Sequence, residues 1–243
     1  MSTQLTFDAL PVSPLPPAAA QLVEPDFTPR PLATITKDFQ DTIRNLSYTR
    51  HSWQVWQDFC ELAALSLANA IVFSREREDR YMATIERYEP KEVQFFPKLL
   101  GMVAEAIEVE FQDFLGQMFM DLEMGNKWRG QFFTPYHLCK AIAQLSLNVD
   151  DFTEDKIVTL NEPACGGGAM VIATCECLRD AGICFHDRLR VIAQDVDVTS
   201  AHMCFIQLSL IGCQAHVIVG NTLAVECLDR YVTPFAMLKG WLN

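Results

Sequence analysis

The sequence predicts an α/β protein in which a helical N-terminal domain precedes a short domain with a mainly parallel sheet. Two observations carry this prediction. Apolar residues recur at three- and four-residue steps between residues 38 and 122, which is the spacing of helices that bury one face. After Gly125, short β-prone runs alternate with helix-like runs, which indicates parallel strands joined by crossover helices.

The first domain is predicted to be helical over residues 36–125, after a proline-rich arm. Residues 1–35 hold seven of the twelve prolines, which favours a flexible arm. Ser52 is a candidate N-cap for a helix whose apolar stripe includes Trp53 and Trp56. A strongly charged helix should end at Glu89, before Pro90, and Pro97 should separate it from a helical region over 99–122.

The second domain, residues 126–243, is predicted to follow a β-α-β-α-β order. The β-prone runs are 157–160, 189–193 and 215–219, and the intervening helical runs are 169–180 and 198–211. A further helix is expected over 136–147. This alternation predicts right-handed crossovers and three neighbouring parallel strands.

The composition excludes several classes of protein. Half of the 243 residues are hydrophobic and 21% are charged, so a packed core can form. The longest apolar stretch, residues 62–73, is shorter than the roughly 20 residues of a membrane span, and we expect no membrane partner. The N-terminus lacks the basic residue of a secretion signal, and none of the nine cysteines forms a CxxC pair. We therefore expect a cytoplasmic protein with reduced thiols and no metal site.

The charge balance argues against a large DNA-coating surface. The net charge is −12, from 19 basic and 31 acidic residues, whereas phosphate contacts need clustered Lys and Arg. The charged helix carries Arg75, Arg77, Arg80 and Arg87 among acidic residues. This alternation favours intrahelical ion pairs on a solvated face over phosphate contacts, although a local basic groove is compatible with the composition.

A glycine-rich segment, EPACGGGAM at residues 162–170, follows the first predicted strand and opens the next helix. Consecutive glycines lack Cβ atoms, so a ligand can approach the backbone at this turn. The segment is neither a Walker loop, because no Lys-Ser/Thr follows, nor the dinucleotide pattern GxGxxG. A tight strand-to-helix turn without a ligand is the alternative interpretation.

Polar residues end the second and third predicted strands. Asp195 follows the second strand, where a carboxylate can accept both hydroxyls of a ribose, and Asp197 is a better candidate for helix capping. Asn221 follows the third strand, beside the same crevice, although an ordinary turn also explains it. Some thirty residues before the glycines, GQFFTP at 130–135 suggests an aromatic anchor and a turn before a helix.

Together, these four segments resemble the S-adenosylmethionine-dependent N6-adenine DNA methyltransferases of type I restriction-modification systems. GQFFTP is similar to the family's first cofactor motif, EPACGGGAM to its glycine loop, AQDVD at 193–197 to its ribose-binding strand end, and GNTL at 220–223 to the adenine-side strand end. The phrase Asp113-Phe114-Leu115-Gly116 is also similar. The resemblance covers roughly residues 110–223 and implies a truncated Rossmann-like methyltransferase domain that acts on DNA.

The resemblance also implies roles for individual residues toward S-adenosylmethionine. Asp195 would hold the ribose hydroxyls, and Asn221 would meet the adenine amine, where the family commonly has Asp. The remaining cofactor-binding residues would surround the methionine end, and they are Phe133, Thr134, Pro135, Glu162, Ala164, Cys165, Gly166 and Gly168.

The sequence departs from this family at its catalytic signature. The tetrapeptide Asn/Asp-Pro-Pro-Tyr/Phe is absent, and the nearest similar segment is VTPF at 232–235. Phe235 or Tyr136 would stack on the target base, and Asn221 or a backbone carbonyl would accept a hydrogen bond from its amine. The alternative is that Phe235 belongs to a hydrophobic tail packed on the core.

A strand order of 3-2-1 leaves the first strand at an open edge. We expect residues 231–238 to add a strand there, or a second subunit to cover it, which favours a homodimer or a partner chain.

Two functional hypotheses follow. The first is methyl transfer from S-adenosylmethionine to N6 of adenine in DNA. The second is a catalytically inactive cofactor-binding pseudo-methyltransferase that acts as a regulatory or decoy subunit of a restriction-modification system. Methyl transfer to RNA or protein is a third reading that the sequence leaves open.

Overall fold

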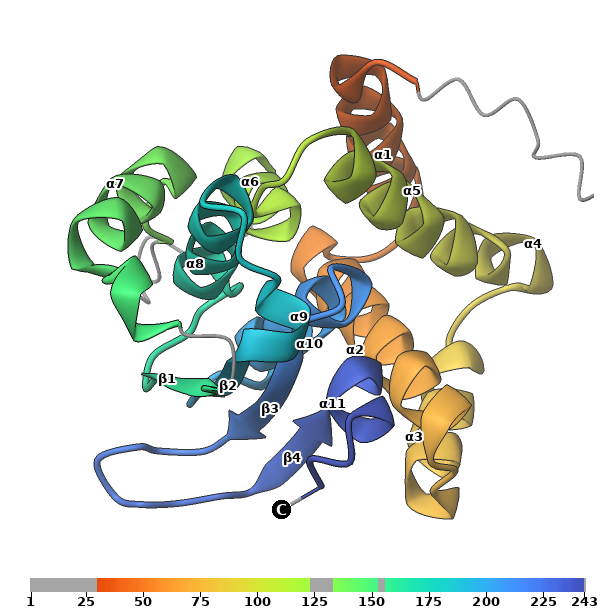
Figure 1. Ribbon diagram of the computed structural model, residues 1–243. Helices are drawn as coiled ribbons and strands as arrows, with labels where there is room; N and C mark the ends of the chain where they lie inside the picture. The colour runs from red at the N-terminus through yellow and green to blue at the C-terminus, as the bar shows by residue number, and fades with distance from the viewer. Residues whose placement is uncertain (1–29, 123–132, 153–155, 243) are drawn as a thin grey trace, which may run out of the picture.

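The computed structural model describes residues 30–122, 133–152 and 156–242 (Figure 1). Residues 1–29, and with them most of the predicted arm, lie outside the described residues, as does the GQF of the GQFFTP segment. In Figure 1 the sheet lies beside the long helix α2 (Ser52–Ile71), and helices α1, α4 and α5 lie farther from the sheet.

A four-stranded sheet forms the second half of the chain, in the order β1-β2-β3-β4. Strands β1 (Val158–Glu162), β2 (Leu189–Asp195) and β3 (Gln214–Val219) are parallel, which confirms the predicted mainly parallel sheet. Both β1 and β2 run two residues beyond their predicted ends, because Glu162 pairs with Ala193 and Asp195 with Val219. Their acidic side chains therefore stand at the carboxyl edge of the sheet.

Residues 231–238 were predicted to add a strand beside the first strand, and this prediction is wrong. The fourth strand is β4 (Asp229–Val232). It pairs antiparallel with β3, at the edge opposite β1. Thr233 fixes this placement, since its Oγ1 accepts from Ala215 N at 2.9 Å and donates to the carbonyl of Cys213 at 2.7 Å. The chain then turns into helix α11 (Pro234–Leu238) instead of continuing as a strand. Among the described residues, β1 has a strand neighbour on one side only.

The N-terminal half is helical, as predicted, with shifted boundaries. Helix α1 begins at Leu32, inside the segment that the prolines predict as an arm, because Pro31 is tolerated as its N-cap. His51 caps α2, so Ser52 is its first residue. The charged helix ends at Ile85, and Pro97 lies in the first turn of the next long helix. The helices are α1 (Leu32–Leu46), α2 (Ser52–Ile71), α3 (Arg75–Ile85), α4 (Pro90–Val93), α5 (Phe95–Val109) and α6 (Phe114–Asp121).

The two halves of the chain share one hydrophobic core. Trp56 and Phe59 of α2 are fully buried and lie in the same cluster as Val191 of β2 and Val217 of β3. Helix α2 packs against α10, which in turn packs on β2 and β3. The remaining helices of the second half are α7 (Tyr136–Ser146), the 3-10 turn η1 (Val149–Asp151), α8 (Ala169–Asp180), α9 (Phe185–Arg188) and α10 (Val198–Leu210).

Two arginines of the charged helix, Arg75 and Arg80, pair with carboxylates, whereas Arg77 donates to the carbonyl of Val72 at 3.1 Å. Arg75 forms the expected intrahelical pair with Asp79 at 2.9 Å. Arg80 instead bridges elements, pairing with Glu61 of α2 at 2.8 Å and with Asp229 of β4 at 3.2 Å. These pairs support the prediction that the helix makes ion pairs, and they show that some of the pairs are tertiary.

Among the described residues, none of the helices combines the length and the apolar character that crossing a membrane requires.

Candidate functional site

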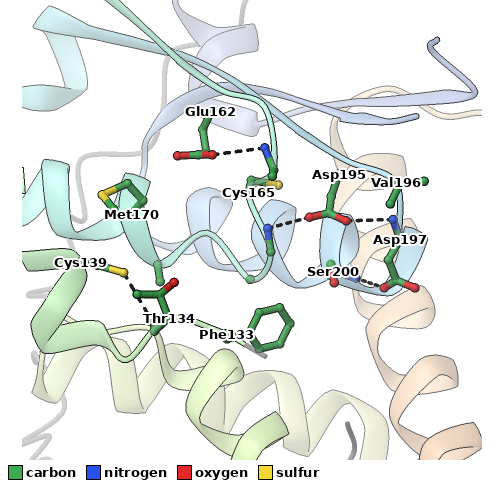
Figure 2. A pocket seen from close by; sticks show the side chains of 14 residues that line it. Phe133, Thr134, Cys139, Glu162, Cys165, Met170, Asp195, Val196, Asp197 and Ser200 are labelled. Atoms are coloured by element: carbon green, nitrogen blue, oxygen red, sulfur yellow. Dashed lines mark hydrogen bonds between the residues drawn. The ribbon is translucent and has the colours of Figure 1, made fainter. Parts of the chain in front are cut away.

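A cavity of about 700 Å³ opens at the carboxyl ends of β1 and β2 (Figure 2). Its volume lies within the range of small-molecule sites. Three segments form its wall: the residues that lead into α7 and its first turn, the glycine-rich loop with the start of α8, and the end of β2 with the start of α10. Parallel strands bring their carboxyl ends to one edge, so segments far apart in sequence meet here.

The glycine-rich loop owes its shape to two residues with left-handed backbone. Gly166 has φ +51° and Gly168 has φ +98°, a region that side-chain-bearing residues rarely adopt. A Cβ on Gly166 would lie 2.9 Å from the ring of Phe133, so the ring packs directly on the loop backbone. On the sheet side, Cys165 N donates to the carbonyl of Gln194 at 2.9 Å. The loop is therefore held between the sheet and an aromatic ring.

Asp195 ends β2 with its carboxylate at the cavity wall (Figure 2). Its Oδ2 accepts from Gly166 N at 2.9 Å, and its Oδ1 accepts from Asp197 N at 2.9 Å. A carboxylate offers about four acceptor positions, so each oxygen keeps one for a ligand. Asp197 accepts from Ser200 N at 2.8 Å and caps α10, which confirms the capping role predicted for it.

The cavity wall is acidic. Glu162, Asp195 and Asp197 line it, and no Lys or Arg belongs to its described lining. Glu162 is oriented by Ala164 N, which donates to its Oε1 at 3.2 Å. Burial, with the charges of Asp113 and Glu162, raises the pKa of the Cys139 thiol, so this part of the wall stays neutral. Such a site favours a cationic small molecule with hydroxyl groups and disfavours a phosphate.

Comparison with known proteins assigns the family. Residues 112–232 match the family model described as N-6 DNA methylase. The chain carries an N-6 DNA methylase domain. No curated protein sequence matches the chain.

Among solved structures, a Listeria monocytogenes protein described as a class I S-adenosylmethionine-dependent methyltransferase matches at 14% identity with a TM-score of 0.46. The match covers 82% of this chain and 55% of that protein, so the chain spans little more than half of that protein's length.

The acidic cavity of the methylase domain fits the cofactor that the family implies. S-adenosylmethionine carries a cationic sulfonium, an ammonium group and a ribose diol. The carboxylates of Glu162, Asp195 and Asp197 match the two cations and the diol. The described part of the same wall carries no Lys or Arg that could pair with the phosphates of a nucleotide.

Most residues predicted to bind the cofactor gather around this cavity. The lining includes Phe133, Thr134, Glu162, Ala164, Cys165, Gly166 and Asp195. Two others lie next to it without lining it. Pro135 is the N-cap of α7, and Gly168 is the N-cap of α8, with its α-carbon facing Cys204.

None of the three residues predicted to act on the target base lines this cavity. Asn221, which was also predicted to meet the cofactor's adenine amine, lies close to its edge, because Gly220 N donates to the carbonyl of Asp195 at 2.9 Å. Asn221 follows β3, where its Oδ1 accepts from Leu223 N at 3.0 Å and Ala224 N at 3.3 Å, as in an ordinary turn. Tyr136 donates its hydroxyl to Glu176 at 2.9 Å, between α7 and α8. Phe235 lies beside Gly212, before the start of β3, so it is at the end of the sheet opposite the cavity. Phe235 is half-buried there, against the ring of His186.

Several lining residues were not predicted. Cys139 lies one turn into α7, Met170 one residue into α8, and Ser200 in the first turn of α10. Val196 follows Asp195 and is 71% exposed. The helix N-termini were predictable, and residues in the first turn of a helix that starts at a strand end face the same crevice. That signal would have identified Met170 and Ser200, whereas Cys139 depends on how α7 docks.

Proposed function

We propose that the chain binds S-adenosylmethionine in the acidic cavity and transfers its methyl group to N6 of adenine in DNA. The observation that carries the proposal is the carboxylate of Asp195, held at the tip of β2 by the loop amide of Gly166 and still able to accept two hydrogen bonds. The family of residues 112–232 supports the choice of cofactor and of DNA as the substrate.

The chain's own residues would bind the cofactor and orient it. Asp195 would accept the ribose hydroxyls, and Glu162 would attract the ammonium group. Phe133 and Thr134 would close the side of the cavity opposite the strands. The bound cofactor supplies a methyl group on a sulfonium, which is already a strong electrophile. Positioning of the two reactants would therefore supply most of the rate, and no strong acid or base is required of the protein.

A second candidate function is supported by the placement of Phe235 and Asn221. Neither lines the cavity, so these two residues do not provide a stacking ring and an amide for a flipped base there. Most Lys and Arg side chains of the described residues also form ion pairs with carboxylates of this chain. A cofactor-binding subunit that lacks turnover of its own, and regulates or imitates a restriction-modification subunit, would have these features. Its partner chain, or a second copy, would add a strand to the free edge of β1.

One experiment separates the two candidates. The purified protein is incubated with methyl-labelled S-adenosylmethionine and unmethylated plasmid, and N6-methyladenine is measured, while calorimetry reports cofactor binding. Label in adenine that disappears in Asp195→Ala supports the enzyme. Cofactor binding without any label in DNA supports the regulatory subunit. Absence of cofactor binding by the folded protein would contradict both.

A further inference from the structure

A buried glutamine of α10 connects the helical half of the chain to the glycine-rich loop. Gln207 is fully buried. Its Nε2 donates to the carbonyl of Gly167 at 2.8 Å and to Asp113 Oδ1 at 2.7 Å. Its Oε1 accepts from Leu115 N at 3.0 Å. One side chain thus ties together α10, the start of α6 and the loop that lines the cavity.

The orientation of the Gln207 amide is fixed by its partners. Both hydrogens of Nε2 meet acceptors, and Oε1 meets a donor. A flipped amide would set its oxygen against the Asp113 carboxylate and the Gly167 carbonyl, and its nitrogen against an N–H. Every contact would then be unfavourable, and in a buried site unpaired polar groups are costly. The Gln207 amide therefore has only one favourable orientation in this network.

Asp113 completes this network from the N-terminus of α6. It is buried, and its Oδ1 also accepts from Gly116 N at 2.9 Å as the N-cap of the helix. A Cβ on Gly116 would overlap the Asp113 carboxylate, at 1.9 Å from Oδ2, so the glycine provides the space for the acid. A Cβ on Gly167 would lie 3.2 Å from Asp113 Oδ1, which shows how closely the loop rests on this carboxylate.

The glycine-rich loop is consequently held on two sides. On the cavity side, the amide of Gly166 donates to Asp195. On the buried side, the carbonyl of Gly167 accepts from Gln207. These two hydrogen bonds act on adjacent residues of a loop whose glycines would otherwise have wide conformational freedom. Loss of either bond releases part of the surface on which a ligand is positioned.

We propose that Gln207, supported by Asp113, is a positioning residue for cofactor binding: it sets the glycine-rich loop in its binding conformation from the buried side and touches no cofactor atom. The proposal rests on the proposed function, since it takes S-adenosylmethionine as the ligand of the cavity. It assigns a role to the Asp113–Gly116 pair that composition and spacing did not explain, because the acid supports the loop across the boundary between the two halves of the chain.

The test compares three variants with the wild-type protein. Gln207→Leu removes both donors at similar volume. Gln207→Glu keeps the acceptor for Leu115 N and loses the donors. Phe205→Leu is the matched control, because Phe205 is equally buried on α10 but packs against Tyr231, away from the loop. Calorimetry gives the Kd for S-adenosylmethionine, thermal unfolding gives Tm, and amide hydrogen exchange reports on Gly166 and Gly168 in the ligand-free protein.

We expect Gln207→Leu to weaken the Kd about tenfold or more and to speed exchange of the loop amides by a similar factor. Phe205→Leu should lower Tm and leave the Kd within about twofold of the wild-type value. Gln207→Glu should bind weakly at neutral pH and recover part of its affinity as the pH falls, because its protonated carboxyl can donate one of the two lost hydrogen bonds. A merely structural role would give no such recovery.

The outcomes are distinguishable. Wild-type affinity and wild-type loop exchange in a folded Gln207→Leu protein would overturn the proposal, as would an equal loss of affinity in Phe205→Leu. If the wild-type protein binds no S-adenosylmethionine, the proposed function fails. In that case, faster exchange of the loop amides in Gln207→Leu alone would still support the role of Gln207 in holding the loop. Unchanged exchange would overturn that role as well.

Discussion

The two halves of the expected active site differ in how the chain builds them. On the cofactor side, residues from α7, the glycine-rich loop and the tip of β2 converge on one acidic cavity. On the target-base side, none of Asn221, Tyr136 and Phe235 lines the cavity, and each already has a structural partner. The cofactor side is assembled within this chain, whereas the base side is not assembled from the residues that the sequence indicated.

The difference has a physical origin in the topology. Parallel strands bring their carboxyl ends together whatever follows them, so Glu162 and Asp195 meet once β1 and β2 pair. The position of Phe235 instead depends on where the chain goes after β3. Here β4 returns antiparallel to β3, and α11 is carried to the far end of the sheet.

The largest effect is expected for Asp195→Ala. If the carboxylate accepts both ribose hydroxyls, its removal deletes two charge-assisted hydrogen bonds and frees the amide of Gly166, so affinity for S-adenosylmethionine should fall by about a thousandfold, or about 4 kcal/mol. Calorimetry measures the change. Asp180→Ala is the control, since this exposed carboxylate of α8 lies outside the cavity lining. Retention of wild-type affinity in Asp195→Ala would contradict the assignment of the cavity.

The next effect concerns the attachment of β4. His202 of α10 lies 3.0 Å from the hydroxyl of Tyr231, which donates to Asp229 at 2.8 Å, so the imidazole Nε2 donates to the tyrosine. Burial lowers the pKa of His202 to about 4. In the unfolded chain His202 takes up a proton near pH 6.5, whereas in the folded chain it stays neutral until the pH is near 4. The stability that the neutral histidine contributes is therefore present above pH 6.5 and is lost as the pH falls toward 4. The loss should reach about 3 kcal/mol.

Chemical denaturation between pH 7.5 and 4 tests this expectation. The free energy of unfolding should fall more steeply with decreasing pH in the wild-type protein than in His202→Gln, whose side chain can still bond to Tyr231 without titrating. His137→Gln, at an exposed position, should keep the wild-type slope. Equal slopes in the wild-type protein and His202→Gln would show that the histidine does not govern the acid response of β4.

A smaller effect is expected for Gly166→Ala, compared with Gly182→Ala. Both glycines have positive φ, at +51° and +75°, so each substitution carries a backbone cost of roughly 1–2 kcal/mol. Only Gly166 also faces an obstacle, the ring of Phe133 at 2.9 Å, whereas nothing lies within 4 Å of a Cβ on Gly182. Thermal unfolding should show the greater loss for Gly166→Ala, and only that variant should weaken cofactor binding. Equal losses of stability in the two variants would mean that the Phe133 ring moves aside without a measurable cost.

The sequence predicted those parts of the site that depend on local chemistry. Strand tips, glycine turns and helix caps are specified by neighbouring residues, so the positions of Asp195, Asp197 and the loop followed from their motifs. The edge chosen by β4 was predicted wrongly, because it depends on Thr233 bonding across to β3 and on the tertiary pair of Arg80 with Asp229. Such contacts join residues far apart in the chain and leave no periodic signal. The buried bond of Gln207 to the loop was missed for the same reason.

The smallest effect is expected for Phe235→Leu, which tests the base side directly. The ring lies 5.3 Å from that of His186 and below the ammonium of Lys239, at the amino-terminal end of β3. Leucine retains most of the apolar volume there, so we expect less than about 1.5 kcal/mol of lost stability and a Kd for S-adenosylmethionine within about twofold of the wild-type value. The measurements are thermal unfolding and calorimetry, with methyl incorporation into DNA as the third.

If incorporation disappears while stability and cofactor affinity persist, α11 must reach the base after a rearrangement of the chain beyond β3, and the contrast between the two sides no longer holds. If incorporation persists, the stacking group for the base lies elsewhere than in the tail, and a partner chain becomes the first place to search for it.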